Sequence, residues 1–317
     1  MTDLKNLNLT ILEKKDANSI LDLINLIQPS IPWSKEYLEW QFFENPMGSA
    51  KIYGIKNLEK KVVAIYTAVP KKIKFENYDL KGRMIQDVMT HPNYRGQGFL
   101  HKLGAICLED MKKNEEIGYT FPNEKSEKSF RRNNWHELCA IPLRTKFISK
   151  NLDNKINLVP TKIEGNFDQS ISSIWDCSGI KIGINRDVEY LNWRYRKPGS
   201  KYFKFILNSN EGILILKIFK EKEISFLHIC DLIVKENKKK LILSALKFTE
   251  QFGKKNNCKV LTSWCNKNHF YSKYYDNFKM NLSSILRYCL IFFNKKKFKD
   301  LKISEKWYLS QGDSDVY

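Results

Sequence analysis

The stretch "HPNYRGQGFL" at residues 91–100 places an arginine and two glycines where an anion can be held. A run typical of a strand precedes it, and apolar residues at the three- and four-residue spacing of a helix follow it. Glycine lacks a Cβ, so Gly96 and Gly98 let the backbone turn sharply and approach a ligand closely. The free N–H groups and the positive dipole end of the helix then favour a phosphate. An ordinary strand-to-helix connection is the alternative interpretation.

Three features of the sequence occur twice in the same order. "YLEWQFFENP" at residues 37–46 recurs as "YLNWRYRKP" at residues 190–198. Asp87 in "MIQDVMTHP" has a counterpart at Asp231 in "HICDLIVKE", and Asn123 has one at Asn266. The two Asn residues follow their Asp residues by 36 and 35 positions. Recurrence of three features in one order indicates duplicated domains.

The apolar patterns predict the same order of elements in both halves. Short alternating runs such as "KVVAIYTAV" and "GILILKIF" predict strands, and "GFLHKLGAICLEDMKKN" and "KKLILSALKFTEQFGKKN" predict helices. We therefore expect an α/β (α+β) fold of two tandem domains, at residues 1–150 and 160–317. Each domain is expected to hold a mixed, largely antiparallel sheet flanked by helices.

The order strand, "RGQGF", helix, then strand, "FPN", helix resembles the GNAT superfamily of acyl-CoA-dependent N-acyltransferases. The family motif Q/R-x-x-G-x-G/A is matched by Arg95 and Gly98, whereas Leu100 replaces the final small residue. The sequence of residues 87–135 also resembles bacterial members linked to cell-surface polysaccharide loci. The resemblance covers residues 1–150, and it implies tandem GNAT-like domains with an active first half.

The resemblance implies acetyl-CoA as the co-substrate. Backbone N–H groups of the loop would hold its pyrophosphate, and the preceding strand would pair with its pantetheine and polarise the thioester carbonyl. Asn123 would hydrogen-bond the pantetheine with help from Ser126, although a plain turn also explains Asn123. The residues expected at the co-substrate are Val88, Met89, Thr90, Arg95, Gly96, Gln97, Gly98, Phe99, Leu100, Asn123 and Ser126.

Acetyl transfer to a primary amine needs a group that removes a proton from the amine and an acid for the thiolate. Asp87 is the predicted base, because it lies on the strand where the acyl group is expected. The counterpart Asp231 belongs to a half without a phosphate loop, so a structural carboxylate is the alternative for both residues. In the family a tyrosine after the Asn-bearing strand often protonates the thiolate. No tyrosine stands there in this sequence, so the acid stays unassigned.

The C-terminal stretch "EKWYLSQGDSDVY" ends in an aromatic pair and an acidic tip. Chain ends are commonly frayed. The alternative is that Trp307 and Tyr308 anchor the stretch, so that Asp313, Asp315 or the last carboxylate reaches between the halves. Such a carboxylate would bind the ammonium group of the acceptor, and we take Asp315 as the second candidate catalytic residue.

The composition narrows the class of partner. The net charge of +19 favours polyanions, but Lys outnumbers Arg by 45 to 9, as the amino-acid drift of an AT-rich genome produces. Because Arg is the residue that reads phosphates and bases, a dedicated nucleic-acid role is not expected. The seven cysteines are scattered, and no His or Cys spacing predicts a metal site. No apolar run approaches the ~20 residues of a membrane span, and no secretory signal is visible, so a cytoplasmic location is expected.

The second half reads "VKENKKK" where the first reads "HPNYRGQG", and this stretch contains no glycine. We therefore expect a degenerate domain that completes the acceptor site. The predicted activity is transfer of an acetyl or short acyl group to a primary amine, with an amino sugar or nucleotide-linked amino sugar as the acceptor. One alternative is an aminoacyl-tRNA-dependent ligase of the peptidoglycan-bridge type. The other is a CoA-binding protein without catalysis.

Overall fold

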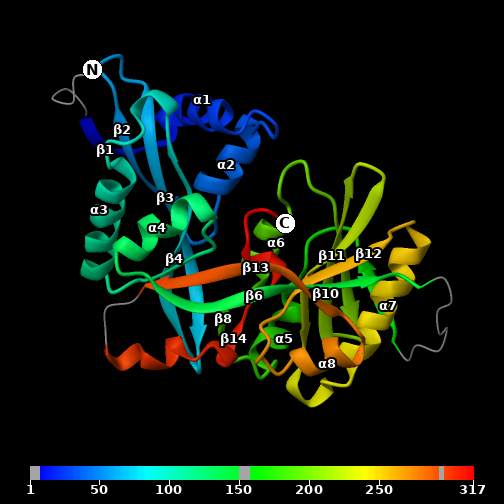
Figure 1. Ribbon diagram of the computed structural model, residues 1–317. Coiled ribbons are helices and arrows are strands. Elements are labelled where there is room, and N and C mark those ends of the chain that lie inside the picture. The colour runs from blue at the N-terminus through cyan, green and yellow to red at the C-terminus, as the bar shows by residue number, and fades with distance from the viewer. Residues whose placement is uncertain (1–7, 150–157, 293–295) are drawn as a thin grey trace.

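A computed structural model describes residues 8–149, 158–292 and 296–317 of the chain (Figure 1). The elements of the first half are β1 (Asn8–Leu12), α1 (Ala17–Ile27), α2 (Lys35–Phe43), β2 (Lys51–Lys56), β3 (Val62–Phe75), β4 (Tyr78–Thr90), α3 (Phe99–Lys113), β5 (Ile117–Thr120), α4 (Glu124–Arg132) and β6 (His136–Phe147). Those of the second half are β7 (Pro160–Ile163), α5 (Ser172–Asp176), β8 (Ile182–Ile184), α6 (Val188–Arg194), β9 (Tyr202–Leu207), β10 (Gly212–Glu221), β11 (Ile224–Val234), α7 (Leu241–Lys255), β12 (Val260–Trp264), α8 (Ser272–Asn277) and β13 (Asn281–Phe292). A tail, residues 307–317, begins with β14 (Trp307–Tyr308).

Within the described residues the strands form one sheet of 14 strands. Its main path runs β1-β2-β3-β4-β5-β13-β6-β12-β11-β10-β9-β7, while β8 and β14 pair to one side. Corresponding strands of the two halves stand at equal distances from the centre of this path. The predicted α/β (α+β) class, with mixed and largely antiparallel pairing flanked by helices, is confirmed.

The two halves exchange their last strands at the centre of the sheet. β13 of the second half pairs antiparallel with β5 of the first, and β6 of the first half pairs antiparallel with β12 of the second. β6 and β13 pair with each other and cross the middle of the molecule side by side (Figure 1). The predicted boundaries at 1–150 and 160–317 stay a prediction, because the connection between them lies largely outside the described residues.

The repeated Tyr-Leu-x-Trp motif lies where the halves meet. Trp40 of α2 and Trp193 of α6 stack with ring centroids 5.0 Å apart. Each indole N–H donates to the other residue's carbonyl, at 2.9 Å from Trp40 and 3.1 Å from Trp193. Both rings belong to a buried cluster that takes side chains from both halves and from the tail. The halves therefore share a core and are held in one fixed relation.

One helix of the first half decides where its loop lies. Phe99, Leu103, Cys107 and Met111 follow one another at four-residue intervals in α3 and are buried against β3 and β4. This apolar stripe fixes α3 on the sheet with its first turn at the end of β4. The glycine-containing loop is thereby placed beside the strand that carries Asp87.

Candidate active site

β4 and β5 stop pairing partway along their length. Their parallel pairing joins Gly82–Met84 to Ile117–Tyr119. Just beyond, the Thr120 hydroxyl donates to the Ile85 carbonyl at 2.8 Å. From there β4 pairs with β3 alone. We call the place where the two strands part the first split.

A β-bulge lies in β4 at the first split. The register with β3 shifts between the pairs Thr67↔Gln86 and Ile65↔Met89. Asp87, in this bulge, has a φ of +48°, a left-handed conformation that costs a non-glycine residue about 1–2 kcal/mol. Bulges redirect side chains and occur next to active sites. Here the bulge sets the Asp87 carboxylate beside the Gln86 amide, which donates to it at 3.0 Å.

The edge of β4 toward the first split offers main-chain groups to a ligand. His91 donates its N–H to the Val63 carbonyl at 2.8 Å, so alternation along the ladder turns the N–H of Thr90 away from β3. Met89 stands opposite Ile65 and points its main chain at β3 instead. Of the three strand residues predicted at the co-substrate, Thr90 therefore faces the split and Met89 does not. Val88 lies in the bulge between them.

The loop at residues 95–98 is built around two left-handed glycines. Gly96 has φ +79° and Gly98 has φ +73°. A Cβ added at either glycine would meet no atom within 4 Å, so each backbone lies open to its surroundings. Gly98 is the N-cap of α3 and supplies no side-chain cap.

Free N–H groups follow from this geometry. The first helical hydrogen bond at this end runs from the Lys102 N–H to the Gly98 carbonyl, so the N–H groups of Phe99 and Leu100 have no partner within the helix. The N–H groups of Gly96, Gln97 and Gly98 have none among the described residues. These five groups lie at the positive end of the α3 dipole, an arrangement suited to a phosphate.

Arg95 differs from the prediction for this loop. Its N–H already donates to the Pro92 carbonyl at 3.3 Å, within a 3-10 turn at Pro92–Tyr94. Its guanidinium Nε donates to the Thr90 carbonyl at 3.4 Å. Arg95 thus folds back on the end of β4, and the free N–H run begins at Gly96.

Asn123 and Ser126 begin α4 next to the first split. The Asn123 Oδ1 accepts from the N–H groups of Lys125 at 3.1 Å and Ser126 at 3.0 Å, and the Ser126 hydroxyl accepts from the Asn123 N–H at 3.2 Å. This capping box satisfies the helix start without any ligand. Ser126 is buried, and its hydroxyl already accepts from the Asn123 N–H. Asn123 is exposed, and its Nδ2 has no partner among the described residues.

Asp87 lies in an environment that disfavours its charge. Burial raises the pKa of its carboxyl to about 8, and the nearby negative charge of Asp315 adds to the rise. The Gln86 amide and the Lys197 ammonium oppose it and are the weaker influences. Burial, and then the negative charges of Asp315 and Asp87, raise the pKa of Tyr37 of α2. The Lys197 Nζ is 5.2 Å from the centroid of the Tyr37 ring. We call these partly exposed residues the junction surface: Tyr37, Asp87, Lys197, Asp315 and Tyr317.

Two buried arginines hold the tail between the halves. Arg194 donates to the main-chain oxygens of Gly312 at 2.9 Å, Ser314 at 2.7 Å and Tyr317 at 2.6 Å. The fully buried Arg186 pairs with Asp313 at 2.7 Å, and the ammonium of Lys197 donates to the Asp315 carbonyl at 2.6 Å. The tail is therefore anchored rather than frayed. The Asp313 carboxylate is paired with Arg186 in the core. Asp315 is the tail carboxylate near Asp87.

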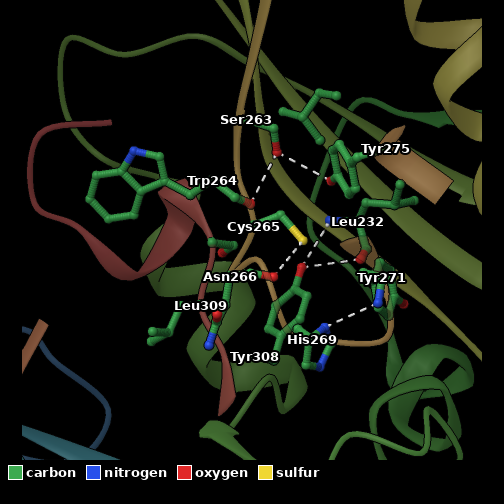
Figure 2. A pocket seen from close by; sticks show the side chains of 12 residues that line it. Leu232, Ser263, Trp264, Cys265, Asn266, His269, Tyr271, Tyr275, Tyr308 and Leu309 are labelled. Carbon is green, nitrogen blue, oxygen red and sulfur yellow. Dashed lines mark hydrogen bonds between the residues drawn. The ribbon is translucent and has the colours of Figure 1, made fainter. Parts of the chain in front are cut away.

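β11 and β12 form a second split, and side chains fill it. These strands pair over Phe226–Ile229 and Val260–Ser263. Beyond that, the Tyr308 hydroxyl accepts from the Leu232 N–H at 3.1 Å, and the Tyr271 hydroxyl accepts from the Val234 N–H at 3.0 Å. Figure 2 shows Tyr308 reaching in from the tail toward Leu232. A small pocket remains, lined by Ile229, Leu232, Ser263, Trp264, Cys265, Asn266, His269, Tyr271, Tyr275, Tyr308, Leu309 and Ser310.

Sequence reasoning named Asp87 and Asp315 of the junction surface, but it missed Tyr37, Lys197 and the arginine Arg194 that holds the tail. Lys197 and Arg194 stand in the second copy of the repeated motif, "YLNWRYRKP", and Tyr37 begins the first copy. The recurrence of the motif was the available signal, since duplicated segments meet at the axis that relates them. Most aromatics of the second half are core residues, as Trp193, Tyr195, Tyr271 and Tyr275 are all buried. Among the described residues, no three His, Cys, Asp or Glu side chains come together as metal ligands.

A comparison with family models finds a match in the first half of the chain. Residues 12–136 match the family model of the acetyltransferase (GNAT) domain. This match, with the first split and its loop, supports an acyl-CoA-dependent N-acyltransferase of the GNAT superfamily. No curated protein sequence matches the chain. No helix of the described residues is long and apolar enough to cross a membrane.

Solved structures share the fold at low sequence identity. A probable N-acyltransferase of Enterococcus faecalis V583 is 14% identical with a TM-score of 0.69, and 91% of this chain covers 73% of that chain. A GCN5-related N-acetyltransferase of Anabaena variabilis is 12% identical with a TM-score of 0.68 and the same coverages. The N-myristoyltransferase of Saccharomyces cerevisiae with bound myristoyl-CoA is 9% identical with a TM-score of 0.61, over 93% of this chain and 85% of that chain. Both halves of this chain therefore have counterparts in known folds.

Proposed function

We propose that the chain is a tandem GNAT-like enzyme with one acyl-CoA site, at the first split, and one amine site, at the junction surface. The observation that carries the proposal is that the free N–H groups of Gly96–Leu100 and the lone carboxylate of Asp87 lie at the same split. An anion-binding loop and a candidate base are thereby set at either end of one open strand edge.

The residues of the first split fit acyl-CoA. The five free N–H groups would hold the pyrophosphate, and the edge of β4 at Val88 and Thr90 would pair with the pantetheine. The Asn123 Nδ2 would add one donor. When bound, acyl-CoA supplies an acyl group activated as a thioester.

The carboxylates of the junction surface act on the acceptor amine. Asp315 and Asp87 attract the ammonium form, and the ionised Asp87 takes one proton from it. The neutral amine then bonds to the acyl carbon, and the second proton that the nitrogen loses goes to the leaving sulfur. The carbon–sulfur bond breaks, and the thiol is released after taking up a proton. Positioning the amine beside the thioester supplies most of the remaining rate gain. An amino sugar is the acceptor we propose.

Thiol release with a panel of primary amines tests the proposal, with acetyl-CoA binding measured separately. We expect acetyl-CoA at a hundred times its dissociation constant to stabilise the fold by about 2.7 kcal/mol, and we expect amine-dependent thiol release. Acetyl-CoA binding without thiol release for any amine would favour a non-catalytic role. A response to charged tRNA in place of acetyl-CoA would favour the ligase.

A further inference from the structure

A row of aromatic rings leads away from the first split across the second half. The ring centroids are 5.2 Å apart between Phe121 and Trp264, 5.5 Å between Trp264 and Tyr317, and 5.0 Å between Tyr317 and His228. We call Phe121, Trp264, Tyr317 and His228 the aromatic strip. It runs from the end of β5, beside the split, to β11.

The strip is not a closed core. Trp264 is buried, but Phe121, Tyr317 and His228 remain half-buried. At the outer end Phe219 stacks on His228, with centroids 5.9 Å apart, and is 47% exposed. Partly exposed rings in a row offer flat faces to a ligand with rings of its own.

A cation without an acidic partner stands beside the strip. Lys217 of β10 lies opposite His228 in the antiparallel register, so both side chains project from the same face. No carboxylate of the described residues pairs with the Lys217 ammonium, which lies 5.6 Å from the centroid of the Tyr202 ring. Burial lowers the pKa of Lys217, as it does for a cation whose counter-ion is missing. Burial and Lys217 lower the pKa of His228 to about 4, so His228 is neutral there.

The tail ties the strip to the amine site. Arg194 at 2.6 Å and the Tyr202 hydroxyl at 3.0 Å both donate to the main-chain oxygen of Tyr317. Two positions earlier, Asp315 is the carboxylate that adds to the charge around Asp87. The end of the chain thus lies between the halves (Figure 1). From the split outward, the two carboxylates of Asp87 and Asp315 come first. The aromatic strip, Lys217 and Phe219 follow.

We propose, on the basis of the proposed function, that the acceptor is a nucleotide-linked amino sugar bound along this strip. Its amine would lie at Asp87 and Asp315, and its sugar would stack on Phe121 and Tyr317. Its diphosphate would pair with Lys217. Its base would stack on the exposed face of Phe219.

Calorimetric binding of nucleoside diphosphates to CoA-saturated protein tests the acceptor site, because saturating CoA keeps the probes out of the phosphate loop. UDP, dTDP and ADP are the probes. We expect at least one to bind the wild type, Lys217→Met to weaken that binding at least tenfold, and Tyr317→Leu to weaken binding of the matching nucleotide-linked amino sugar several-fold. Lys220→Met is the matched control, three positions along β10 on the opposite face, and we expect less than a twofold change.

The outcomes separate this inference from the proposed function. If CoA binds and simple amines are acetylated, but no probe binds or Lys217→Met behaves like Lys220→Met, then the nucleotide site is wrong and the transferase stands. If CoA itself fails to bind, both are wrong. Probe binding that depends on Lys217 supports both.

Discussion

The two splits share one backbone plan and differ in what fills them. At the first, the N–H of Thr90 faces the split without a side-chain partner among the described residues. At the second, Tyr308 and Tyr271 accept from the equivalent edge of β11, at Leu232 and Val234. The loop glycines Gly96 and Gly98 have no counterpart in "VKENKKK". The second split therefore lacks the two loop glycines and carries two tyrosine hydroxyls on its strand edge.

The equivalent carboxylates differ in the same way. Within the described part of the chain, the Asp87 carboxylate receives one hydrogen bond, from Gln86. Asp231 is fully buried and receives bonds from Arg186 at 3.1 and 3.2 Å, from Ser310 at 2.6 Å, and from the hydroxyls of Tyr195 and Tyr308. A carboxylate satisfied from every side is structural, whereas one left with little compensation for its burial is available for proton transfer.

The largest expected effect comes from exchanging these carboxylates for amides. We expect Asp87→Asn to lower kcat about 10²–10⁴-fold, the range of a lost general base, with no loss of stability. We expect Asp231→Asn to lower the free energy of unfolding by about 3–5 kcal/mol, because it breaks a buried ion pair and leaves Arg186 with Asp313 as its remaining carboxylate partner among the described residues. Steady-state kinetics and denaturant unfolding on both variants check the pair. Equal losses of stability in the two would contradict the contrast.

The next effect concerns the loop. Gly98→Val should weaken acetyl-CoA binding at least tenfold, because a side chain at φ +73° costs about 1–2 kcal/mol and crowds the free N–H groups. Gly199→Val is the control, since Gly199 has φ +72° with nothing within 4 Å of its added Cβ. Calorimetry should find the affinity unchanged in the control. Similar losses in both variants would mean that the loop is only a turn.

A smaller effect is expected from pH. With the pKa of Asp87 raised to about 8, kcat should rise with pH and level off above 8, because only the ionised carboxylate accepts a proton. Asp315→Asn removes a like charge, so the inflection should move to lower pH. Full pH–rate profiles of the two proteins check this. An inflection that does not move would show that the charge of Asp315 has no influence on the pKa of Asp87.

The raised pKa of Asp87 also makes the free energy of unfolding depend on pH. The folded pKa of Asp87 lies above the unfolded value near 3.9, so the folded state holds the proton more tightly. Its contribution to stability is fully present below pH ~4 and is lost as pH rises through about 8. Asp87→Asn should therefore flatten the decline of unfolding free energy over this window. Denaturant unfolding at several pH values measures it.

The smallest effect is expected at the closed split. Tyr308→Phe removes the hydroxyl that bonds Leu232 and Asp231, and should cost about 1–3 kcal/mol, as a buried group left unpaired does. It should create no second acetyl-CoA site, since the second half lacks the loop. A binding stoichiometry of two in this variant would show that the tyrosine alone closes the site.

Much of the first split could be predicted from the sequence because its signals are local. Two glycines after a strand and before an amphipathic helix specify the loop, since left-handed backbone and apolar periodicity are properties of a few neighbouring residues. The repeat of Asp87 at Asp231 likewise predicted corresponding halves. The prediction that Arg95 offers its N–H to the ligand did not allow for the 3-10 turn at Pro92–Tyr94, which takes up that N–H.

The tertiary structure alone decided the strand exchange and the junction surface. The sequences of β6 and β13 predict strands, but they do not predict that each strand pairs with the other half. Strand propensity does not determine which strands pair. Asp315 and Asp87 lie 228 positions apart in the chain. Their proximity depends on Arg186 and Arg194 holding the tail in place. Residue types and spacing set the loop and the candidate base, and long-range packing chose which charges surround them.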